Sequence, residues 1–233
     1  MKYVFYFWVL WASVSCTSKA KQANKQGMHY IRQGMYEQAI TEFNNTLARD
    51  AEWLPAYYNR AISCANTGRY KEALHDFDFL LTTCPDHTES YFNRGIVYEN
   101  MGLYREAIRD YSQTINLQPH FKEAYHYRGI IRFRVQDYNG ALADYNQAIQ
   151  LGLKETEIYF HRGVIMQISG KTEAAIHDYG EAISLDPSDA KSYYNRGIAE
   201  FSRGEEAEAR NDLEIASRLG FEKAQEALDI YFN

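Results

Sequence analysis

The side chains best suited to catalysis or metal binding are seven histidines and three cysteines, scattered along the 233 residues. No histidine stands at metal-ligand spacing from a second ligand on one predicted helix. The chain also contains no glycine-rich phosphate loop and no nucleophile motif. The sequence therefore predicts no enzyme, no metal and no cofactor. One alternative stays open: His126 and His161 fall one repeat apart and would approach each other, as a weak metal pair in a cryptic enzyme site.

Cys64 and Cys84 fall in the same repeat. They are predicted to lie at opposite ends of a helical hairpin, which is too far apart for a disulfide bond. We expect both to be reduced residues of the packed interior.

Arginine and aspartate recur together every 34 residues and are the other groups with chemistry to offer. A row of arginines suggests anion capture, but an unpaired charge at a packed face is very costly, and paired carboxylates would remove that cost. Pairing is favoured because five repeats carry both residues and the first carries neither, with Gln26 and Glu42 in their places. We expect a structural ladder, within a repeat or between neighbours, formed by Arg60, Asp76, Arg94, Asp110, Arg128, Asp144, Arg162, Asp178, Arg196 and Asp212.

The elements that position these groups follow from the same period, which returns six times without an insertion or deletion. An uninterrupted period of this length indicates a solenoid, in which each repeat packs only on its neighbours. Its clearest marker is a small residue 34 positions after the last one: Gly27, Ala61, Gly95, Gly129, Gly163 and Gly197.

Each repeat is predicted to be a helical hairpin. We number its 34 slots from Ala20, Leu54, Thr88, Lys122, Thr156 and Ala190. Slots 4, 8 and 11 form one helical face, and slots 17, 20, 24, 27 and 28 form an apolar stripe on a second helix. Glycine at slot 15 ends the first helix in the left-handed conformation, and proline at slot 32 ends the second.

The pattern resembles the tetratricopeptide repeat over about seven-eighths of the chain. The resemblance implies an all-α, right-handed α-solenoid of six hairpins (20–53, 54–87, 88–121, 122–155, 156–189 and 190–223), preceded by a linker at 16–19 and followed by a capping helix at 224–233. The fourth repeat departs from the pattern with Gln136 at slot 15. Leu153 and Phe221 replace the slot-32 proline in two repeats, and Ala23 replaces the first slot-4 aromatic.

One side of the first helices is unusually aromatic for a surface that, by the same resemblance, lines a concave groove. In repeats two to six, slot 5 is aromatic or histidine, and slot 6 is asparagine, tyrosine or histidine, which can hydrogen-bond a peptide backbone. Slot 9 is aliphatic and is expected to pack adjacent first helices. Exposed aromatics among polar groups favour protein interfaces. The predicted partner-binding residues are Tyr58, Asn59, Phe92, Asn93, His126, Tyr127, Phe160, His161, Tyr194 and Asn195.

The expected ligand is a protein or peptide with apolar or aromatic character. The best-known tetratricopeptide site clamps acidic chaperone tails with lysine at slot 5 and asparagine at slot 9, which this chain lacks. Slot 2 carries Glu89, Glu123 and Glu157, which favour either a basic ligand or simply the helix dipole. The net charge of −6 weakens any nucleic-acid interpretation.

The first 15 residues read as a secretory signal: Lys2, then an apolar run to Ala12, then small residues. The run is short for a membrane span. Cys16 suggests lipidation as in bacterial lipoproteins, although Ser13 stands where that family usually has leucine. Cleavage by ordinary signal peptidase, and an uncleaved leader, remain alternatives.

Together these features predict a non-catalytic scaffold that binds a partner protein, exported and attached to a membrane of the cell envelope only by a lipid anchor. A self-associating solenoid and a cytosolic adaptor are the rival hypotheses. The oligomeric state and the identity of the partner stay open.

Overall fold

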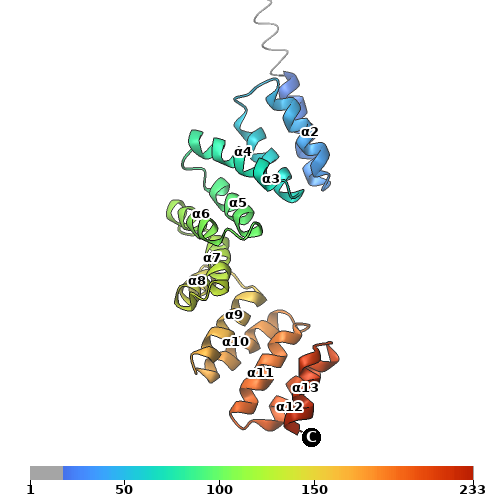
Figure 1. Ribbon diagram of the computed structural model, residues 1–233, viewed down its shortest axis with the longest axis vertical. Coiled ribbons are helices and arrows are strands. Elements are labelled where there is room, and N and C mark those ends of the chain that lie inside the picture. Colours follow the sequence, from blue (N-terminus) through green and yellow to red (C-terminus); the bar gives the residue numbers. More distant parts are fainter. Residues whose placement is uncertain (1–17, 233) are drawn as a thin grey trace, which may run out of the picture. The chain divides into compact units, whose positions relative to one another are not determined.

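The computed structural model describes residues 18–232, so the predicted signal peptide and Cys16 lie outside the described residues. Those residues are helical apart from turns and short links, with no strand among them. Residues 18–32 are helical, and the helices that follow are α2 (Tyr36–Leu47), α3 (Leu54–Asn66), α4 (Tyr70–Thr83), α5 (Thr88–Asn100), α6 (Tyr104–Leu117), α7 (Lys122–Arg134), α8 (Tyr138–Gln150), α9 (Thr156–Ile168), α10 (Thr172–Leu185), α11 (Ala190–Ser202), α12 (Glu206–Arg218) and α13 (Glu222–Phe232) (Figure 1).

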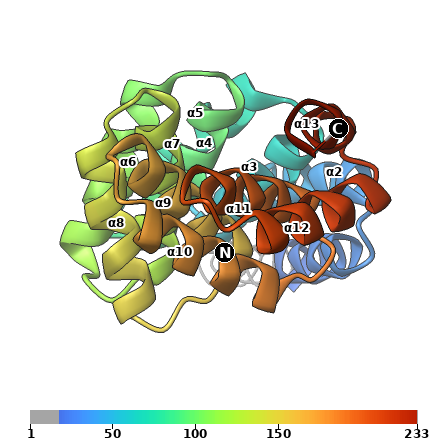
Figure 2. The same ribbon diagram turned by 90° about the horizontal axis from the view of Figure 1, so that it is seen from below.

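The chain divides into two compact halves, 1–119 and 120–233, which we call the N-terminal and C-terminal halves. The N-terminal half holds α2 to α6 and the C-terminal half holds α7 to α13 (Figure 1). Consecutive helices pair as antiparallel hairpins, and first helices also touch the next first helix, as α3 touches α5 and α9 touches α11. In Figure 2, α9 to α12 follow one another side by side across the C-terminal half. The all-α repeat fold predicted from the sequence is thereby confirmed.

Each hairpin closes around one aromatic or aliphatic side chain of its second helix. Tyr111, Tyr145 and Tyr179 are fully buried at slot 24. An added Cβ on Gly129 would come within 2.7 Å of the Tyr145 ring, and Gly163 stands in the same relation to Tyr179. Glycine at slot 8 is therefore what lets the two helices of these hairpins approach closely.

Slot 15 has a left-handed backbone in every hairpin, as the sequence pattern predicts. Its glycines have φ between 71° at Gly34 and 82° at Gly204. Gln136 holds the same conformation, with φ of 63°, although it has a side chain. The turn geometry thus belongs to the repeat, and the fourth hairpin adopts it with an unfavourable residue.

The first hairpin has Ala51 at slot 32, and α2 ends in Ala48 with a right-handed helical backbone; the other links between hairpins are of two kinds. Where a proline occupies slot 32, the residue before it leaves the helical conformation, with ψ between 81° at Cys84 and 94° at Asp186. Where Leu153 and Phe221 replace that proline, the preceding Gly152 and Gly220 take φ of 84° and 88°. In these two hairpins a glycine with a left-handed backbone therefore ends the second helix, where other hairpins have proline.

The ends of the array differ slightly from expectation. Residues 18 and 19, predicted as linker, are already helical, since no glycine or proline interrupts the run into buried Ala20. Helix α13 begins at Glu222, two residues before the predicted capping helix, because Gly220 ends α12 early enough for a new helix to start. Ala224 and Ala227 of α13 pack against Leu213 and Ala216 of α12, so α13 covers the apolar face of the last hairpin.

No helix of the described region is long and apolar enough to cross a membrane.

Candidate binding surface

The five slot-7 arginines are paired with the slot-23 aspartates of their own hairpins. Arg60 Nε and Nη2 donate to Asp76 Oδ2 and Oδ1, both at 2.7 Å. The same two-bond arrangement joins Arg94 to Asp110 at 2.7 and 2.8 Å. The aspartates are about 2–4% exposed and the arginines 13–24%. The arrangement is that of a structural ion pair rather than of arginines open for anion capture, and Arg128–Asp144, Arg162–Asp178 and Arg196–Asp212 repeat it.

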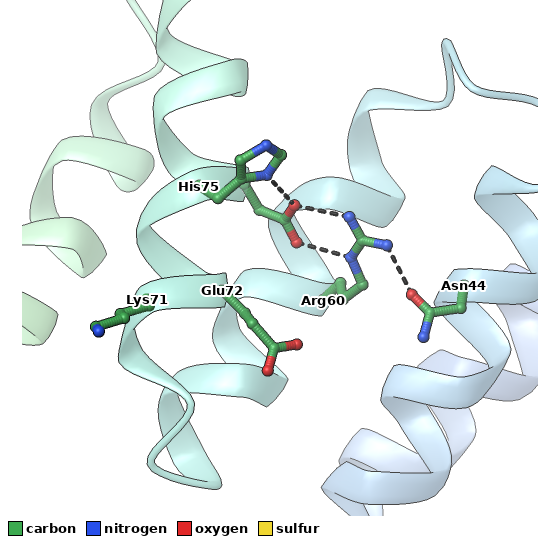
Figure 3. Close-up of a pocket in the computed structure, with 6 residues that line it drawn as sticks. Asn44, Arg60, Lys71, Glu72 and His75 are labelled. Atoms are coloured by element: carbon green, nitrogen blue, oxygen red, sulfur yellow. Dashed lines mark hydrogen bonds and ion pairs between the residues drawn. The ribbon is translucent and has the colours of Figure 1, made fainter.

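A third contact of these arginines joins neighbouring hairpins. Arg60 Nη1 donates to Oδ1 of Asn44 at 2.6 Å, and Arg94 Nη1 donates to Oδ1 of Asp78 at 2.7 Å. Figure 3 shows Arg60 of α3 directed toward Asn44 of α2. Both residues line an open hollow of about 380 Å³, which Asp76 of α4 also lines. The acceptor is at slot 25 of the preceding hairpin, so the ladder arginines form hydrogen bonds both within a repeat and between repeats.

Sequence reasoning missed the tyrosine that completes each arginine site. Arg60 lies with its guanidinium carbon 5.4 Å from the ring centroid of Tyr57, three residues earlier on the same helix. Arg128 and Tyr125 show the same contact at 5.7 Å. Such cation–π pairs add stabilisation to a partly desolvated guanidinium. The signal was present, because a tyrosine precedes every one of the five arginines by three residues.

The ten predicted partner-binding residues all lie on first helices and are all partly buried, neither enclosed nor fully open. Their rings rest on the interior: Tyr58 lies 6.2 Å from the Phe77 ring, and Phe92 lies 5.8 Å from Tyr111. In the C-terminal half, Phe160 lies 6.1 Å from Tyr179. Each half therefore presents its own stretch of aromatic surface, with one part of each ring packed and another part accessible.

In the N-terminal half, the polar groups of this surface bond to each other. Asn93 Nδ2 donates to Tyr58 Oη at 3.0 Å and to the Glu89 carbonyl at 2.8 Å. Burial, followed by the Glu89 charge, raises the pKa of the Tyr58 hydroxyl. Slot 5 of one hairpin thus meets slots 2 and 6 of the next.

In the C-terminal half, the same three slots hold His126, Glu157 and His161. His126 Nε2 lies 3.8 Å from Glu157 Oε2, beyond hydrogen-bond distance. His161 Nδ1 lies 3.1 Å from the Tyr145 hydroxyl, and its ring stacks on Phe133 at 4.3 Å. Burial lowers the pKa of both imidazoles, and that of His161, which the nearby His126 lowers further, to about 4. The His161 ring is therefore neutral at pH 7, and burial favours the neutral form of His126.

The remaining predicted residues are less engaged with each other. Asn195 Nδ2 donates to the Lys191 carbonyl at 2.8 Å, which leaves its side-chain oxygen for other partners. The Tyr194 ring lies 5.0 Å from Phe221, between the last hairpin and α13.

Catalytic and metal chemistry have little support within residues 18–232. No three histidine, cysteine, aspartate or glutamate side chains there are grouped so as to hold a metal. Cys64 is buried and its pKa is raised to about 11 by that burial, so its thiol is unreactive at neutral pH.

Comparison with known families identifies the class of protein. Two models described as tetratricopeptide repeat match residues 24–87 and 88–121, and a model described as TPR repeat matches 168–204. Together they match more than half of the chain. The chain belongs to the tetratricopeptide repeat family, whose fold is in general a non-catalytic scaffold for protein interactions. No curated protein matches the sequence.

Solved structures share the fold. A crystal structure of MamA is 24% identical, with a TM-score of 0.65, over 71% of this chain and 96% of that one. The structure of YrrB, described as a TPR protein with an unusual peptide-binding site, is 20% identical over 80% and 97%, with a TM-score of 0.70. PilF of Pseudomonas aeruginosa is 14% identical over 91% and 99%, with a TM-score of 0.77.

Proposed function

We propose that this protein is an adaptor that binds a segment of a partner protein on the aromatic surface of its first helices. The observation that carries the proposal is the position of the slot-5 rings, which are packed on the hairpin interior along one edge and accessible along the other. Rings fixed in this way lose little conformational freedom on binding, which favours affinity. A neighbouring slot-6 asparagine, such as Asn195, offers a free amide oxygen to a peptide N–H.

The fold supports this proposal in two ways. The helices are ordered by their own packing, so binding requires little rearrangement of the scaffold. YrrB, which shares the fold, is described as binding a peptide. The chemistry of the surface differs from an acidic-tail clamp, and we propose a partner segment that carries aromatic or aliphatic side chains.

The site is tested by replacing Tyr58, Phe92, Phe160 and Tyr194 with alanine. Partners of the tagged wild-type chain are first identified by crosslinking in its native membrane followed by mass spectrometry. Capture of those partners should fall to background in the four-alanine variant, while circular dichroism shows unchanged helix content. A matched control replaces Phe79 and Leu185, which lie on the second helices α4 and α10 and are 39% and 41% exposed, and should capture normally. Equal capture by both variants would exclude the surface.

We further propose that the adaptor works at the cell envelope with Cys16 as a lipidated first residue. The support is the apolar run to Ala12 and the small residues between it and this cysteine. Labelling with a fatty-acid analogue should mark the wild-type chain and not a Cys16→Ser variant. A wild-type chain that takes up no label would leave an ordinary exported protein or a cytosolic adaptor.

A self-associating solenoid is the rival function. Light scattering of the purified chain distinguishes them, since a concentration-independent monomer mass excludes self-association through this surface.

A further inference from the structure

Residues 18–32, the first helix of the array, carry a charge unlike that of the rest of the chain. They include Lys19, Lys21, Lys25 and Arg32 and no aspartate or glutamate, so their formal charge is +4. The rest of the chain has 21 lysines and arginines against 31 acids, and so carries −10. All four cations are exposed. A positive patch of this density on an acidic protein indicates attraction to something negative.

The protein itself does not neutralise these cations by contact. No ion pair joins any of the four to another residue of the described chain. Glu37, the nearest acid in the sequence, is paired with Arg69 at 2.6 Å. Helix α7 is also basic, but there Arg128 and Arg132 each lie 2.7 Å from Asp144. The charge of the first helix is therefore left for solvent or for an external partner.

The charged face is the one that packs on a preceding hairpin in later repeats. Slots 3 and 10 are at most 3% exposed in the five later first helices. In the fifth repeat, for example, these slots hold Ile158 and Ile165, which pack into one cluster with Tyr145 of α8. In the first helix the same slots hold Gln22 and His29, and both are exposed. No hairpin among the described residues covers this face, and its side chains are polar or basic.

The cations are also arranged in line. Lys21, Lys25, His29 and Arg32 follow one another at spacings of four, four and three residues, which places them in one stripe along the helix. Like charges four residues apart destabilise a helix slightly, and interspersed acids would relieve the repulsion. This helix has no such acid. Helix stability therefore does not explain the stripe, whereas attraction to an external negative surface does.

One carboxylate lies near an edge of this face. Glu42 of α2 lines an open hollow of about 470 Å³ together with Lys19, Gln22 and Arg49. Two cations outnumber the carboxylate there, so the hollow does not reverse the sign of the face.

We propose that the exposed face of residues 18–32 contacts a membrane surface rich in anionic lipid headgroups. Position favours a membrane over an acidic protein, because Ser18 follows by two residues Cys16, for which lipidation is proposed above. A chain held at Cys16 brings these cations to the headgroup layer, where lysine and arginine are attracted to anionic lipids. A lipid chain and a basic patch are together two signals that make membrane attachment stable. The inference rests on the proposed envelope location and adds that the first hairpin faces the membrane.

The test measures co-sedimentation of the full chain with lipid vesicles, using Cys16→Ser to prevent acylation. Vesicles of equal parts phosphatidylglycerol and phosphatidylcholine are compared with vesicles of phosphatidylcholine alone. The neutral vesicles measure any binding by the apolar N-terminal run, which does not depend on lipid charge. The anionic vesicles should bind the chain about tenfold more tightly or better, and added salt should remove the difference.

The charge variant combines Lys19→Gln, Lys21→Gln and Lys25→Gln. It should lose the preference for anionic vesicles, a weakening of about tenfold or more, with unchanged helix content by circular dichroism. Arginine at the same three positions should preserve binding, because a lipid surface attracts either cation. The matched control makes the same change in net charge at three exposed lysines of the C-terminal half, and should bind normally: Lys154, Lys171 and Lys223.

Three results would overturn the membrane-facing helix. The first is equal binding of the unsubstituted face to both kinds of vesicle, and the second is equal weakening by the charge variant and its control. The third is lysine-dependent binding to polyglutamate or double-stranded DNA without a preference for anionic vesicles, which would favour an acidic macromolecule.

These outcomes are separate from those of the proposed function. If the three lysines direct binding to anionic vesicles while the wild-type chain takes up no fatty-acid label, the membrane-facing helix stands and the lipid anchor is wrong. If the label is taken up and the vesicles show no preference, the anchor stands and the membrane-facing helix is wrong. Partner capture by the four-alanine variant is decided independently of both.

Discussion

In the N-terminal half, Arg60 and Arg94 reach back to Asn44 and Asp78 of the preceding hairpins. In the C-terminal half, Arg162 reaches Asn146 at 3.0 Å, but Arg196 finds Gly180 at the equivalent place, with no side chain to accept a hydrogen bond. Three buried side-chain atoms without partners are found among the described residues. Two of them, on His126 and Glu200, lie in the C-terminal half.

The comparison separates the repeat positions that specify the fold from the positions that vary between hairpins. The slots that define the hairpin are occupied in nearly the same way six times, so they carry the fold. The slots that face a neighbour or a ligand differ between the halves, and two of the three unsatisfied polar atoms, on Asn24 and His126, lie at one of them, slot 5. A buried polar atom without a hydrogen bond at such a slot therefore indicates a residue that is not chosen for stability alone. Ligand binding is one reason for such a residue.

The largest expected effect comes from removing the carboxylate of a ladder pair in each half. Asp76→Ala leaves Arg60 with no carboxylate, only the neutral Asn44 and the Tyr57 ring, and should lower the free energy of unfolding by about 3 kcal/mol. Asp212→Ala should cost only about 1–2 kcal/mol, because Glu200 Oε1 lies 3.7 Å from Arg196 Nε and replaces the lost charge. Urea denaturation followed by circular dichroism measures both. Equal losses would show that Glu200 does not compensate in the C-terminal half.

The second prediction restores the missing contact of the C-terminal half. An added Cβ on Gly180 would meet only Arg196 Nη1, at 3.5 Å. Gly180→Ala should therefore raise the free energy of unfolding by about 0.5–1 kcal/mol, through helix propensity alone. Gly180→Asn should exceed Gly180→Ala by about 0.5 kcal/mol, because a hydrogen bond from Arg196 Nη1 worth about 1 kcal/mol is partly offset by the weaker helix propensity of asparagine.

Gly163→Ala is the control for that prediction. Here the added methyl group would lie 2.7 Å from the buried Tyr179 ring, so the substitution should lower the free energy of unfolding by about 1–3 kcal/mol. Thermal or urea denaturation of the three variants should therefore give changes of opposite sign. Asparagine is a weaker helix former than alanine by about 0.5 kcal/mol, so the contact between hairpins contributes nothing to stability if Gly180→Asn falls below Gly180→Ala by that amount.

The third prediction concerns the pH dependence that Glu200 adds to the C-terminal half. Burial, with Asp212 as the next cause, raises the pKa of Glu200 from 4.5 to about 7. Because the folded pKa lies above the unfolded one, the folded state holds a proton that the unfolded chain releases in this window. The stabilisation is therefore complete below pH 4.5 and is lost as the pH rises to about 7.

Glu200→Met tests this with the residue that the preceding hairpin carries at the same slot, Met166. Between pH 5 and pH 8 the wild-type chain should lose about 1–2 kcal/mol that the variant does not lose. Glu226→Gln, a change at an exposed carboxylate, should leave the wild-type slope intact. A variant with the wild-type slope would show that Glu200 is ionised at no unusual cost.

The sequence predicts the helical hairpins of this protein well, because the residues that start and end their helices act locally and recur in each repeat. Glycine at slot 15, proline at slot 32 and the joint occurrence of Arg94 with Asp110 each follow from conformational or electrostatic need within one hairpin. The contacts between hairpins could not be predicted in the same way. Slot 25 changes from Asn44 to Asp78 to Gly180, and only coordinates show that Nη1 of the next arginine points there.

The candidate surface shows the same limit. Repeat spacing alone placed His126 near His161 and put both on the same side of the first helices as Phe160. It did not show that His161 turns to Tyr145, or that His126 Nε2 is left without a partner 3.8 Å from Glu157. Those outcomes depend on side-chain rotamers and on distances across two hairpins, which a slot pattern does not encode.

The smallest expected effect sharpens the comparison at a single backbone position. Gln136 adopts φ of 63° in the turn of the fourth hairpin, where the other hairpins use glycine. Gln136→Gly should raise the free energy of unfolding by about 1 kcal/mol, because glycine adopts this conformation without the clash between Cβ and the backbone. Gly102→Gln makes the reverse change in the N-terminal half and should cost a similar amount, since an added Cβ there meets nothing within 4 Å. Urea denaturation of both variants measures the difference. If Gln136→Gly is neutral while Gly102→Gln destabilises, the Gln136 side chain must contribute an interaction that offsets its backbone strain. The turn of the fourth hairpin would then be another place where the C-terminal half departs from the repeat pattern and gains a stabilising contact of its own.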